Sequence, residues 1–410
     1  MFEIMNENTG HPIKVWLNDM DSLEDKCLEQ AYHLSQLPFV HKWVCLMPDT
    51  HTGKGMPIGG VFAAKDVVIP NAVGTDIGCG MVFTATNVKV ADIREIQTGN
   101  GTIIQSVIGD LMREIPVGRT KYQKPQPCRT LDAAKDNGFW DGENTELMEA
   151  VEEGYYQIAT LGGGNHFIEL QEDEEGYLCI MIHSGSRHLG ACICEHFNAV
   201  ARENAAKWGS TIPEEYRLDY LPTDTDEGRQ YLDWMGLAMD YACENRTKMM
   251  EAAKHAVKAK VEKFTDYRVE YTDDINCHHN YASLEEHYGE TVWVHRKGAT
   301  RARAGEKAVI PGAMGSYSYV VVGKGNAESF DTSSHGAGRR HSRTAAKEIF
   351  TTEQVIVDLK QQGVILGKRK KNDVAEECRF AYKDIDEVMA QQKDMVEIVR
   401  KLHTVGVIKG

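Results

Sequence analysis

The hydrophobic pattern of the chain switches between short apolar runs and longer amphipathic stretches. Apolar runs of strand length predict β-strands that include residues 14–17, 42–47, 67–69, 81–85, 179–183, 292–295 and 317–322. Apolar positions that recur every three to four residues predict helices, most clearly at 21–36, 143–159, 190–208, 228–263 and 384–402. Strands and helices do not alternate regularly. The pattern therefore predicts an α+β fold, a single large domain over residues 1–410 with central β-sheets flanked by helices and a largely helical insertion near 189–265.

Composition is typical of a folded protein of the cytoplasm. The chain has 410 residues and is 42% hydrophobic, which is enough for a sizeable core. No apolar run has the length of a membrane span, and the N-terminus lacks the basic-then-apolar pattern of a secretory signal. The ten cysteines contain no C-x-x-C pair, as expected in a reducing compartment. We expect a soluble cytoplasmic protein, and nothing in the sequence requires more than a monomer.

The net charge of −15 argues against indiscriminate binding to nucleic acid. Charge is nevertheless uneven along the chain. Basic residues gather at 296–307 and 339–343, where they flank glycine-rich turns. These turns are better placed to bind anions than an evenly solvated surface. Any contact with nucleic acid is therefore expected in a local basic groove.

Glycines gather in clusters that almost all carry a histidine, cysteine, aspartate or basic residue. The clusters read HTGKGMPIGG, VGTDIGCG, LGGGNHF, HSGSRHLG, RKGATRARAG, PGAMG and SHGAGR. Turns that are scattered over a surface seldom carry so many side chains capable of catalysis or ligand binding. Polar loops that converge on one pocket would give this pattern.

The segment TSSHGAGRR, at 332–340, places a histidine in a cradle suited to anions. Its two glycines let the backbone turn and expose N–H groups, and its two arginines can pair with phosphate oxygens. His335 is therefore placed to attack phosphorus and to carry a phosphoryl or nucleotidyl group as a phosphoramidate. A surface loop that contains a histidine by chance explains this segment equally well when the segment is taken alone.

A second set of residues has the chemistry of a metal site. Asp76 and Cys79 lie three residues apart on one tight turn. Imidazoles come from other clusters, at His166, His183, His278 and His279. Carboxylate, thiolate and imidazole suit zinc as well as manganese, and a cysteine sulfur among histidines can bridge two ions. Each histidine alone is more often a core or surface residue, but the set favours a two-metal site for phosphoryl displacement.

Three further segments offer contacts to a nucleotide. The run GGGNHFIE supplies backbone N–H groups, the Asn165 amide and the Glu169 carboxylate, which can accept from N1–H and the 2-amino group of guanine. The turn PGAMGSYS adds the Ser318 hydroxyl. Lys409 is close to the C-terminus, where side chains normally fray. The preceding GVI predicts a strand that would hold this lysine inward.

Eight motifs occur in the order found in the RtcB-type RNA ligases, which the chain resembles from about residue 11 to its C-terminal KG. They read MPDTHTGKG, VGTDIGCGM, LGGGNHFIE, HSGSRHLG, INCHHN, PGAMG, SHGAGR and AYKDID. The length and the form NCHHN are closest to the bacterial branch. The resemblance implies a GTP- and manganese-dependent ligase of RNA repair or tRNA splicing. Such an enzyme joins an RNA 3′-phosphate or 2′,3′-cyclic phosphate to a 5′-hydroxyl end.

The resemblance also implies roles for individual residues. His335 would become guanylylated and would pass GMP to the RNA as an RNA-3′-pp-5′-G end. Two Mn²⁺ ions would be held by Asp76, Cys79, His166, His183 and His279, with Cys79 bridging them. The positions matching GMP contacts are Asn165, His166, Phe167, Ile168, Glu169, His279, Asn280, Pro311, Gly312, Ala313, Met314, Ser318, His335, Gly336, Ala337, Gly338 and Lys409. Contacts to RNA are expected from Arg119, Arg187 and Arg339, although capping or salt bridging suits Arg119 and Arg187 almost as well. The sequence names no activating protein.

Two positions depart from the family pattern, and two other functions compete with the ligase. Ala313 stands where serine is common and Thr75 where valine is commoner, so we expect an effect on nucleotide affinity at most. A dinuclear metal-dependent phosphoesterase would need the metal ligands but not the set His335, Asn165, Glu169 and Lys409. An RNA-binding adaptor without chemistry would be expected to lack some ligands, and all are present.

Overall fold

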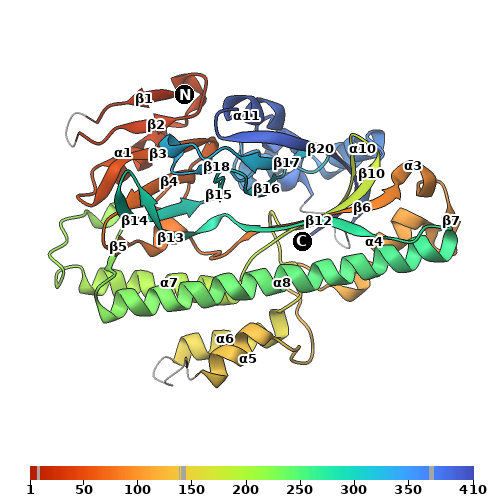
Figure 1. Ribbon diagram of the computed structural model, residues 1–410, viewed down its shortest axis with the longest axis horizontal. Coiled ribbons are helices and arrows are strands. Elements are labelled where there is room, and N and C mark those ends of the chain that lie inside the picture. Colours follow the sequence, from red (N-terminus) through yellow and green to blue (C-terminus); the bar gives the residue numbers. More distant parts are fainter. Residues whose placement is uncertain (7–9, 138, 140–144, 369–373) are drawn as a thin grey trace.

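Two β-sheets of six and eight strands lie at the centre of the protein, in a computed structural model that describes residues 1–6, 10–137, 139, 145–368 and 374–410. The helices flank these sheets (Figure 1). The α+β fold with central sheets that the sequence predicts is therefore confirmed.

The larger sheet is antiparallel except at one short strand. Its order is β12 (Tyr271–His278), β6 (Gly80–Lys89), β10 (Tyr177–Ser184), β9 (Phe167–Asp173), β20 (Val396–Lys409), β17 (Tyr317–Gly323) and β16 (Lys307–Ile310). The strand β19 (Ile365–Gly367) pairs with β20 in parallel. Three strands from the first half of the chain, β6, β10 and β9, lie between strands from the second half, so the sheet brings distant motifs together.

The smaller sheet is built mainly from the N-terminal part of the chain. Its order is β1 (Phe2–Ile4), β2 (Ile13–Val15), β3 (Val40–His51), β4 (Ile58–Ala64), β14 (Glu290–Lys297) and β13 (Asn280–His287). In the described part of the chain, three strand pairs lie outside both sheets: β5 (Val67–Val68) with β11 (Leu221–Pro222), β15 (Ala299–Arg301) with β18 (Thr332–Ser334), and β7 (Gln97–Thr98) with β8 (Gly101–Thr102).

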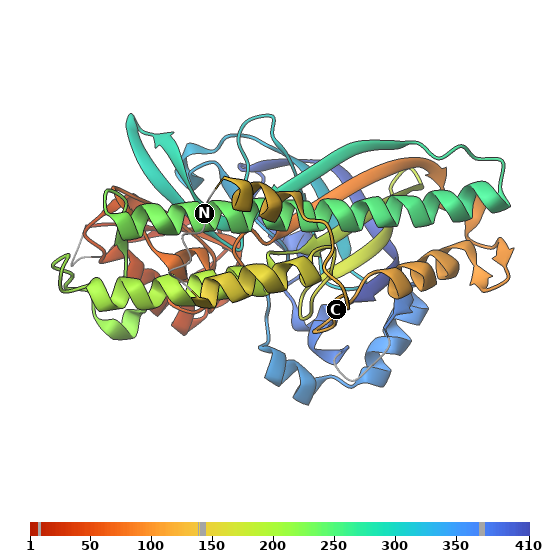
Figure 2. The ribbon, with the colours of Figure 1, turned by 90° about the horizontal axis from the view of Figure 1, so that it is seen from below.

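One long helix, α8 (Asp226–Phe264), runs along the molecule beneath the sheets (Figure 1). The Thr225 side chain caps its start by accepting from the backbone N–H of Gly228, and acidic residues in its first turn suit the helix dipole. Helix α7 (Arg187–Asn204) lies beside it, as Figure 2 shows from below. The side of α8 toward β6 and β10 buries aliphatic residues in one core with theirs.

The remaining helices are shorter and cover other faces. They are α1 (Asp25–Ser35), α2 (Pro70–Val73), α3 (Val90–Ile93), α4 (Ile103–Glu114), α5 (Arg129–Asp136), α6 (Thr145–Gln157), α9 (Arg343–Ile349), α10 (Thr352–Gln361) and α11 (Ile385–Gln391). Single 3₁₀ turns occur at Met20–Ser22, Glu214–Tyr216, Ala327–Ser329, Ala375–Glu377 and Arg379–Ala381. Among the described helices, none combines the length and the apolar character needed to cross a membrane.

One predicted helix is wrong. The stretch 384–402 begins as α11 but continues, after a short turn, as the strand β20. Its apolar residues also fit helical spacing, yet β17 and β9 on either side supply backbone partners along most of β20. Long-range pairing therefore decided the structure. Every other predicted helix and strand overlaps an observed element, with residues 143 and 144 of the predicted helix 143–159 outside the described part.

Candidate active site

Glycine-rich loops from both sheets surround a cavity of about 890 Å³. It lies where β6, β9, β10, β12 and the C-terminal end of β20 meet the loops at 311–314 and 335–343. The sequence-predicted residues that line it are Asp76, Cys79, Asn165, His166, Phe167, Glu169, His183, Arg187, His279, Asn280, Pro311, Gly312, Ala313, Met314, His335, Gly336, Ala337, Gly338, Arg339 and Lys409. Ile168, Ser318 and Arg119 lie outside the lining.

Strand register brings the five proposed metal ligands together. His183, near the end of β10, is paired with Phe167 of β9 on one side and Met81 of β6 on the other. His166 immediately precedes β9, and Cys79 immediately precedes β6. Cys277 and His278 of β12 pair with Met81 and Gly80, so His279 arrives at the same edge.

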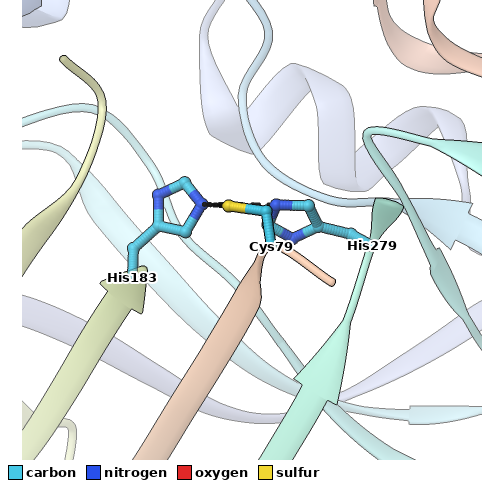
Figure 3. A group of neighbouring side chains, drawn as sticks. All are labelled: Cys79, His183 and His279. Carbon is cyan, nitrogen blue, oxygen red and sulfur yellow. Dashed lines mark hydrogen bonds between the residues drawn. The ribbon is translucent and has the colours of Figure 1, made fainter. Parts of the chain in front are cut away.

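The five side chains form two groups that share one sulfur. Cys79 Sγ lies 3.3 Å from Nε2 of His183, which is 3.3 Å from Nε2 of His279 (Figure 3). Cys79 Sγ also lies 3.4 Å from Nε2 of His166, which is 3.0 Å from Oδ2 of Asp76. Each group could hold one cation, with Cys79 common to both. The neighbouring His278 is not in either group.

The hydrogen bonds behind the imidazoles leave the facing nitrogens available as ligands. Nδ1 of His166 lies 2.9 Å from the Leu161 carbonyl oxygen, and Nδ1 of His183 lies 3.1 Å from that of Asn165. A carbonyl oxygen only accepts, so each Nδ1 carries the proton and each neutral ring directs a lone pair from Nε2. Carbonyl-bound imidazoles of this kind are typical of metal ligands. The residues therefore fit a two-metal site.

Burial favours the uncharged imidazoles that a metal needs. Burial, with nearby His166, holds the pKa of His183 well below its usual range, and burial with nearby His335 does the same for His279. Burial and the Asp76 carboxylate raise the pKa of the Cys79 thiol well above its usual range. A cation bound at this sulfur would supply the charge that stabilises the thiolate.

The candidate nucleophile has a partner that the sequence analysis missed. Nδ1 of His335 lies 2.6 Å from Oδ2 of Asp49, a fully buried carboxylate that also accepts from the backbone N–H groups of His335 and Gly336. Since a carboxylate accepts, Nδ1 carries the proton and Nε2 is the free ring nitrogen. A Cβ at Gly338 would lie 2.1 Å from the Asp49 carbonyl oxygen, and φ there is +74°. Glycine is required for this close approach.

The proposed guanine acceptor, Glu169, is buried on β9. Its Oε2 accepts from Nε2 of Gln171 at 2.7 Å and from the Thr404 hydroxyl at 3.0 Å. Burial raises the pKa of Glu169 to about 7, against the lowering effect of these two bonds and of Lys409. Ser318 contacts the same network, since Nε2 of Gln171 lies 3.3 Å from its hydroxyl.

The C-terminal lysine is held inward. Lys409 is the last residue of β20 and is 5% exposed. Its Nζ lies 3.3 Å from the buried carboxylate of Glu377 and above the ring of Phe167. Both views place the C-terminus near the middle of the molecule (Figures 1 and 2). The strand that the sequence predicted before Lys409 is confirmed.

The three arginines proposed for RNA differ in their surroundings. Arg187 lines the cavity and donates to the Thr160 hydroxyl and the Gly118 carbonyl. Arg339 donates to Glu377 and to the Tyr382 hydroxyl. Arg119 is exposed outside the cavity. Arg343, which the sequence analysis did not single out, lines the cavity and is half exposed.

Comparison with known proteins gives one consistent family. The model of the family described as tRNA-splicing ligase RtcB matches residues 30–410. The chain is 37% identical to RNA-splicing ligase RtcB1 from an Escherichia coli strain and 36% identical to RNA-splicing ligase RtcB of Escherichia coli K12, in each case over 97% of both chains. It is 33% identical to tRNA-splicing ligase RtcB of Thermococcus kodakarensis, over 94% of this chain and 92% of that protein.

Proposed function

This chain belongs to the RtcB family of RNA-splicing ligases, and we propose that it joins RNA ends with GTP and manganese through a histidine–GMP intermediate. It is an RNA ligase by family. Its proposed substrates are an RNA end with a 3′-phosphate or 2′,3′-cyclic phosphate and an end with a 5′-hydroxyl. We place its action in the cytoplasm, as a monomer, in RNA repair or tRNA splicing.

The first step is guanylylation of His335. Its Nε2 lone pair attacks the α-phosphorus of GTP, a P–N bond forms, the bond to the β-phosphate breaks and pyrophosphate leaves. Asp49 holds the opposite nitrogen, Nδ1–H, at 2.6 Å. The carboxylate therefore fixes the reactive tautomer and stabilises the positive charge that develops on the ring.

The residues Asp76, Cys79, His166, His183 and His279 would hold the two manganese ions. Bound there, the ions would neutralise phosphate oxygens as charge builds up on the attacked and leaving groups. The rings of His279 and His335 lie 4.7 Å apart. This short distance supports a site in which the cations and the nucleophile act on one phosphate.

The second and third steps transfer GMP and seal the RNA. A cyclic phosphate is first opened by water to a 3′-phosphate. An oxygen of that phosphate attacks the phosphorus on His335, the P–N bond breaks, and the RNA end becomes RNA-3′-pp-5′-G. The 5′-hydroxyl of the other strand then attacks the RNA phosphorus, loses its proton to solvent and displaces GMP. Arg187 and Arg343, at the cavity wall, are suited to hold the RNA phosphates.

Guanine selectivity is proposed to come from Glu169 and Lys409. The Glu169 carboxylate can accept from N1–H and the 2-amino group of guanine, and Lys409 supplies a donor beside the same wall of the cavity. Adenine presents no such pair of donors. The remaining proposed contacts, at 311–314 and 335–338, offer backbone N–H groups to the phosphates and ribose.

The observation that carries the proposal is the Asp49–His335 pair, because its histidine lines the same cavity as the five-residue ligand cluster while its buried carboxylate lies behind the ring. A phosphoesterase would need the cluster but not an oriented histidine nucleophile. The test is ligation of short RNAs with defined ends. We expect joining of 3′-phosphate or cyclic phosphate to 5′-hydroxyl with GTP and Mn²⁺, and none with a 3′-hydroxyl end or without nucleotide. Release of phosphate without joining would instead favour the metal-dependent phosphoesterase.

A further inference from the structure

The middle of helix α8 carries three consecutive buried polar residues, which an amphipathic helix does not predict. Glu244, Asn245 and Arg246 are 6%, 0% and 0% exposed. Glu244 accepts from the backbone N–H groups at the start of α5, away from the cavity. Asn245 and Arg246 instead turn toward the segments that carry the proposed metal ligands.

Arg246 ties together three of these segments. Its Nη1 donates to the carbonyl oxygens of Gly78 at 2.8 Å and Ser184 at 3.0 Å, and its Nη2 lies 3.2 Å from Nδ1 of His278. Each of these residues is the immediate chain neighbour of a proposed ligand, in turn Cys79, His183 and His279. A single rigid guanidinium thus fixes the backbone beside three ligands.

Asn245 holds the fourth ligand-bearing segment, the loop before His166, next to the end of β10. Its Nδ2 donates to the Ser184 hydroxyl and the Gly185 carbonyl, both at 3.1 Å, and to the Thr160 carbonyl at 3.2 Å. Its Oδ1 accepts from the Thr160 backbone N–H. Thr160 begins the glycine-rich loop that leads to His166, so Asn245 holds the start of this loop beside the end of β10.

Burying the charged side chain of Arg246 costs folding free energy, and packing alone does not account for its presence. It is fully buried and, among the described residues, forms no ion pair with a carboxylate. The other fully buried arginine, Arg296, has the Glu285 carboxylate at 2.5 Å. A buried charge held only by neutral acceptors is expensive. The presence of the buried Arg246 guanidinium is explained if it holds those acceptors, and the backbone beside the proposed ligands, in a fixed position.

We propose that Asn245 and Arg246 are positioning residues of the metal site, which hold the backbone next to Cys79, His183 and His279 and the loop before His166. The inference rests on the proposed two-metal site of the ligase. Ligands must lie within about 0.5 Å of the required geometry, and loss of a supporting hydrogen bond behind a ligand typically weakens metal binding 10- to 100-fold.

The test is cobalt binding to the full-length protein, because Co²⁺ reports both affinity and thiolate ligation in its absorption spectrum. We compare the wild type with Arg246→Met, which removes the contacts of the guanidinium to Gly78, Ser184 and His278, and Arg246→Lys, which keeps the charge and part of the bonding. Glu244→Gln is the matched control, since it changes a buried polar residue of the same helix that touches no ligand-bearing segment.

We expect about 100-fold weaker cobalt binding in Arg246→Met, about tenfold weaker binding in Arg246→Lys, and a change within about twofold in Glu244→Gln. The thiolate-to-cobalt band shifts or fades in both Arg246 variants. If Arg246→Met does not fold, the cobalt affinities and spectra of Arg246→Lys and Asn276→Ala test the inference in its place. The latter removes the exposed side chain whose Oδ1 accepts from Nε of Arg246 at 2.9 Å.

Two results overturn the inference in distinguishable ways. Arg246 variants with lower melting temperature but unchanged cobalt affinity and spectrum would show a purely structural residue, while the metal site itself stands. A folded wild type that binds no cobalt and shows no thiolate band would overturn the proposed metal site, and the positioning role with it.

Discussion

Single residues decide whether His335 can act as a nucleophile. The sequence predicts His335 from its glycine and arginine neighbours, but not Asp49, which lies 286 positions earlier in the chain. Only the fold brings β3 and the SHGAGR loop together. The available signal was weak: one carboxylate among the histidine and glycines of MPDTHTGKG. The proposed metal ligands were easier to predict, because four of the five lie in glycine-rich turns, although only the resemblance separated His279 from His278.

Asp49→Asn tests the orientation of the nucleophile. The amide keeps the shape of the side chain, but its NH₂ group can donate to Nδ1 and so favour the tautomer with the proton on Nε2. We expect guanylylation in a single turnover to slow by about 10²- to 10⁴-fold, with cobalt binding unchanged. Asp66→Asn, at an exposed site, is the control. A rate within threefold of the wild type would mean that Asp49 does not orient His335.

We expect guanine binding to depend on pH through the proposed acceptor Glu169. Burial raises its pKa to about 7, so the carboxyl is largely neutral at pH 6 and ionised at pH 8. Only the carboxylate accepts both guanine donors, and affinity for GMP should therefore fall about tenfold as pH drops from 8 to 6. Calorimetric titration of GMP at pH 6, 7 and 8 measures this. Glu169→Gln should bind weakly at every pH, and an equal pH dependence in that variant would exclude Glu169 as the cause.

At the scale of elements, β20 is the strand that the sequence analysis partly misassigned. Its first residues have a helical hydrophobic spacing, and local pattern alone could not show that β17 and β9 leave a place for a strand between them. The C-terminal GVI was assigned correctly because it is β-branched and precedes a polar end. The strand predicted from GVI indicated that Lys409 lies inward, but only the position of β20 in the sheet shows that it reaches the cavity.

Lys409→Met tests whether the lysine at the end of β20 contributes to GMP binding. Methionine keeps the apolar stem and removes the charged donor, whose Nζ lies above the ring of Phe167. We expect GMP affinity to fall about tenfold or more, since a hydrogen bond from a charged group contributes about 1.5–3 kcal/mol. The melting temperature should change little. Lys401→Met, at a partly buried lysine on the same strand that lies outside the cavity, is the control. Equal GMP affinity in wild type and Lys409→Met would contradict the assignment.

For the whole molecule, the five proposed ligands come from strands and loops spread between residues 76 and 279, so metal binding should stabilise the entire fold. Saturation at 100 times the dissociation constant adds about 2.7 kcal/mol per site. For a chain of this length, that corresponds to a rise in melting temperature of roughly 3 °C. Differential scanning calorimetry with Mn²⁺ and with EDTA measures it. Cys79→Ser should lose most of the rise, and a full rise in that variant would place the metal elsewhere.

Covalent labelling with α-³²P-GTP tests the central claim most directly. The protein is incubated with labelled GTP and Mn²⁺, denatured, and analysed for acid-labile label on the chain. We expect the wild type to be labelled, and His335→Ala and Cys79→Ala to remain unlabelled. Label that persists in His335→Ala, or a folded wild type that takes up none, would contradict a histidine–GMP ligase and leave the metal-dependent phosphoesterase as the better account.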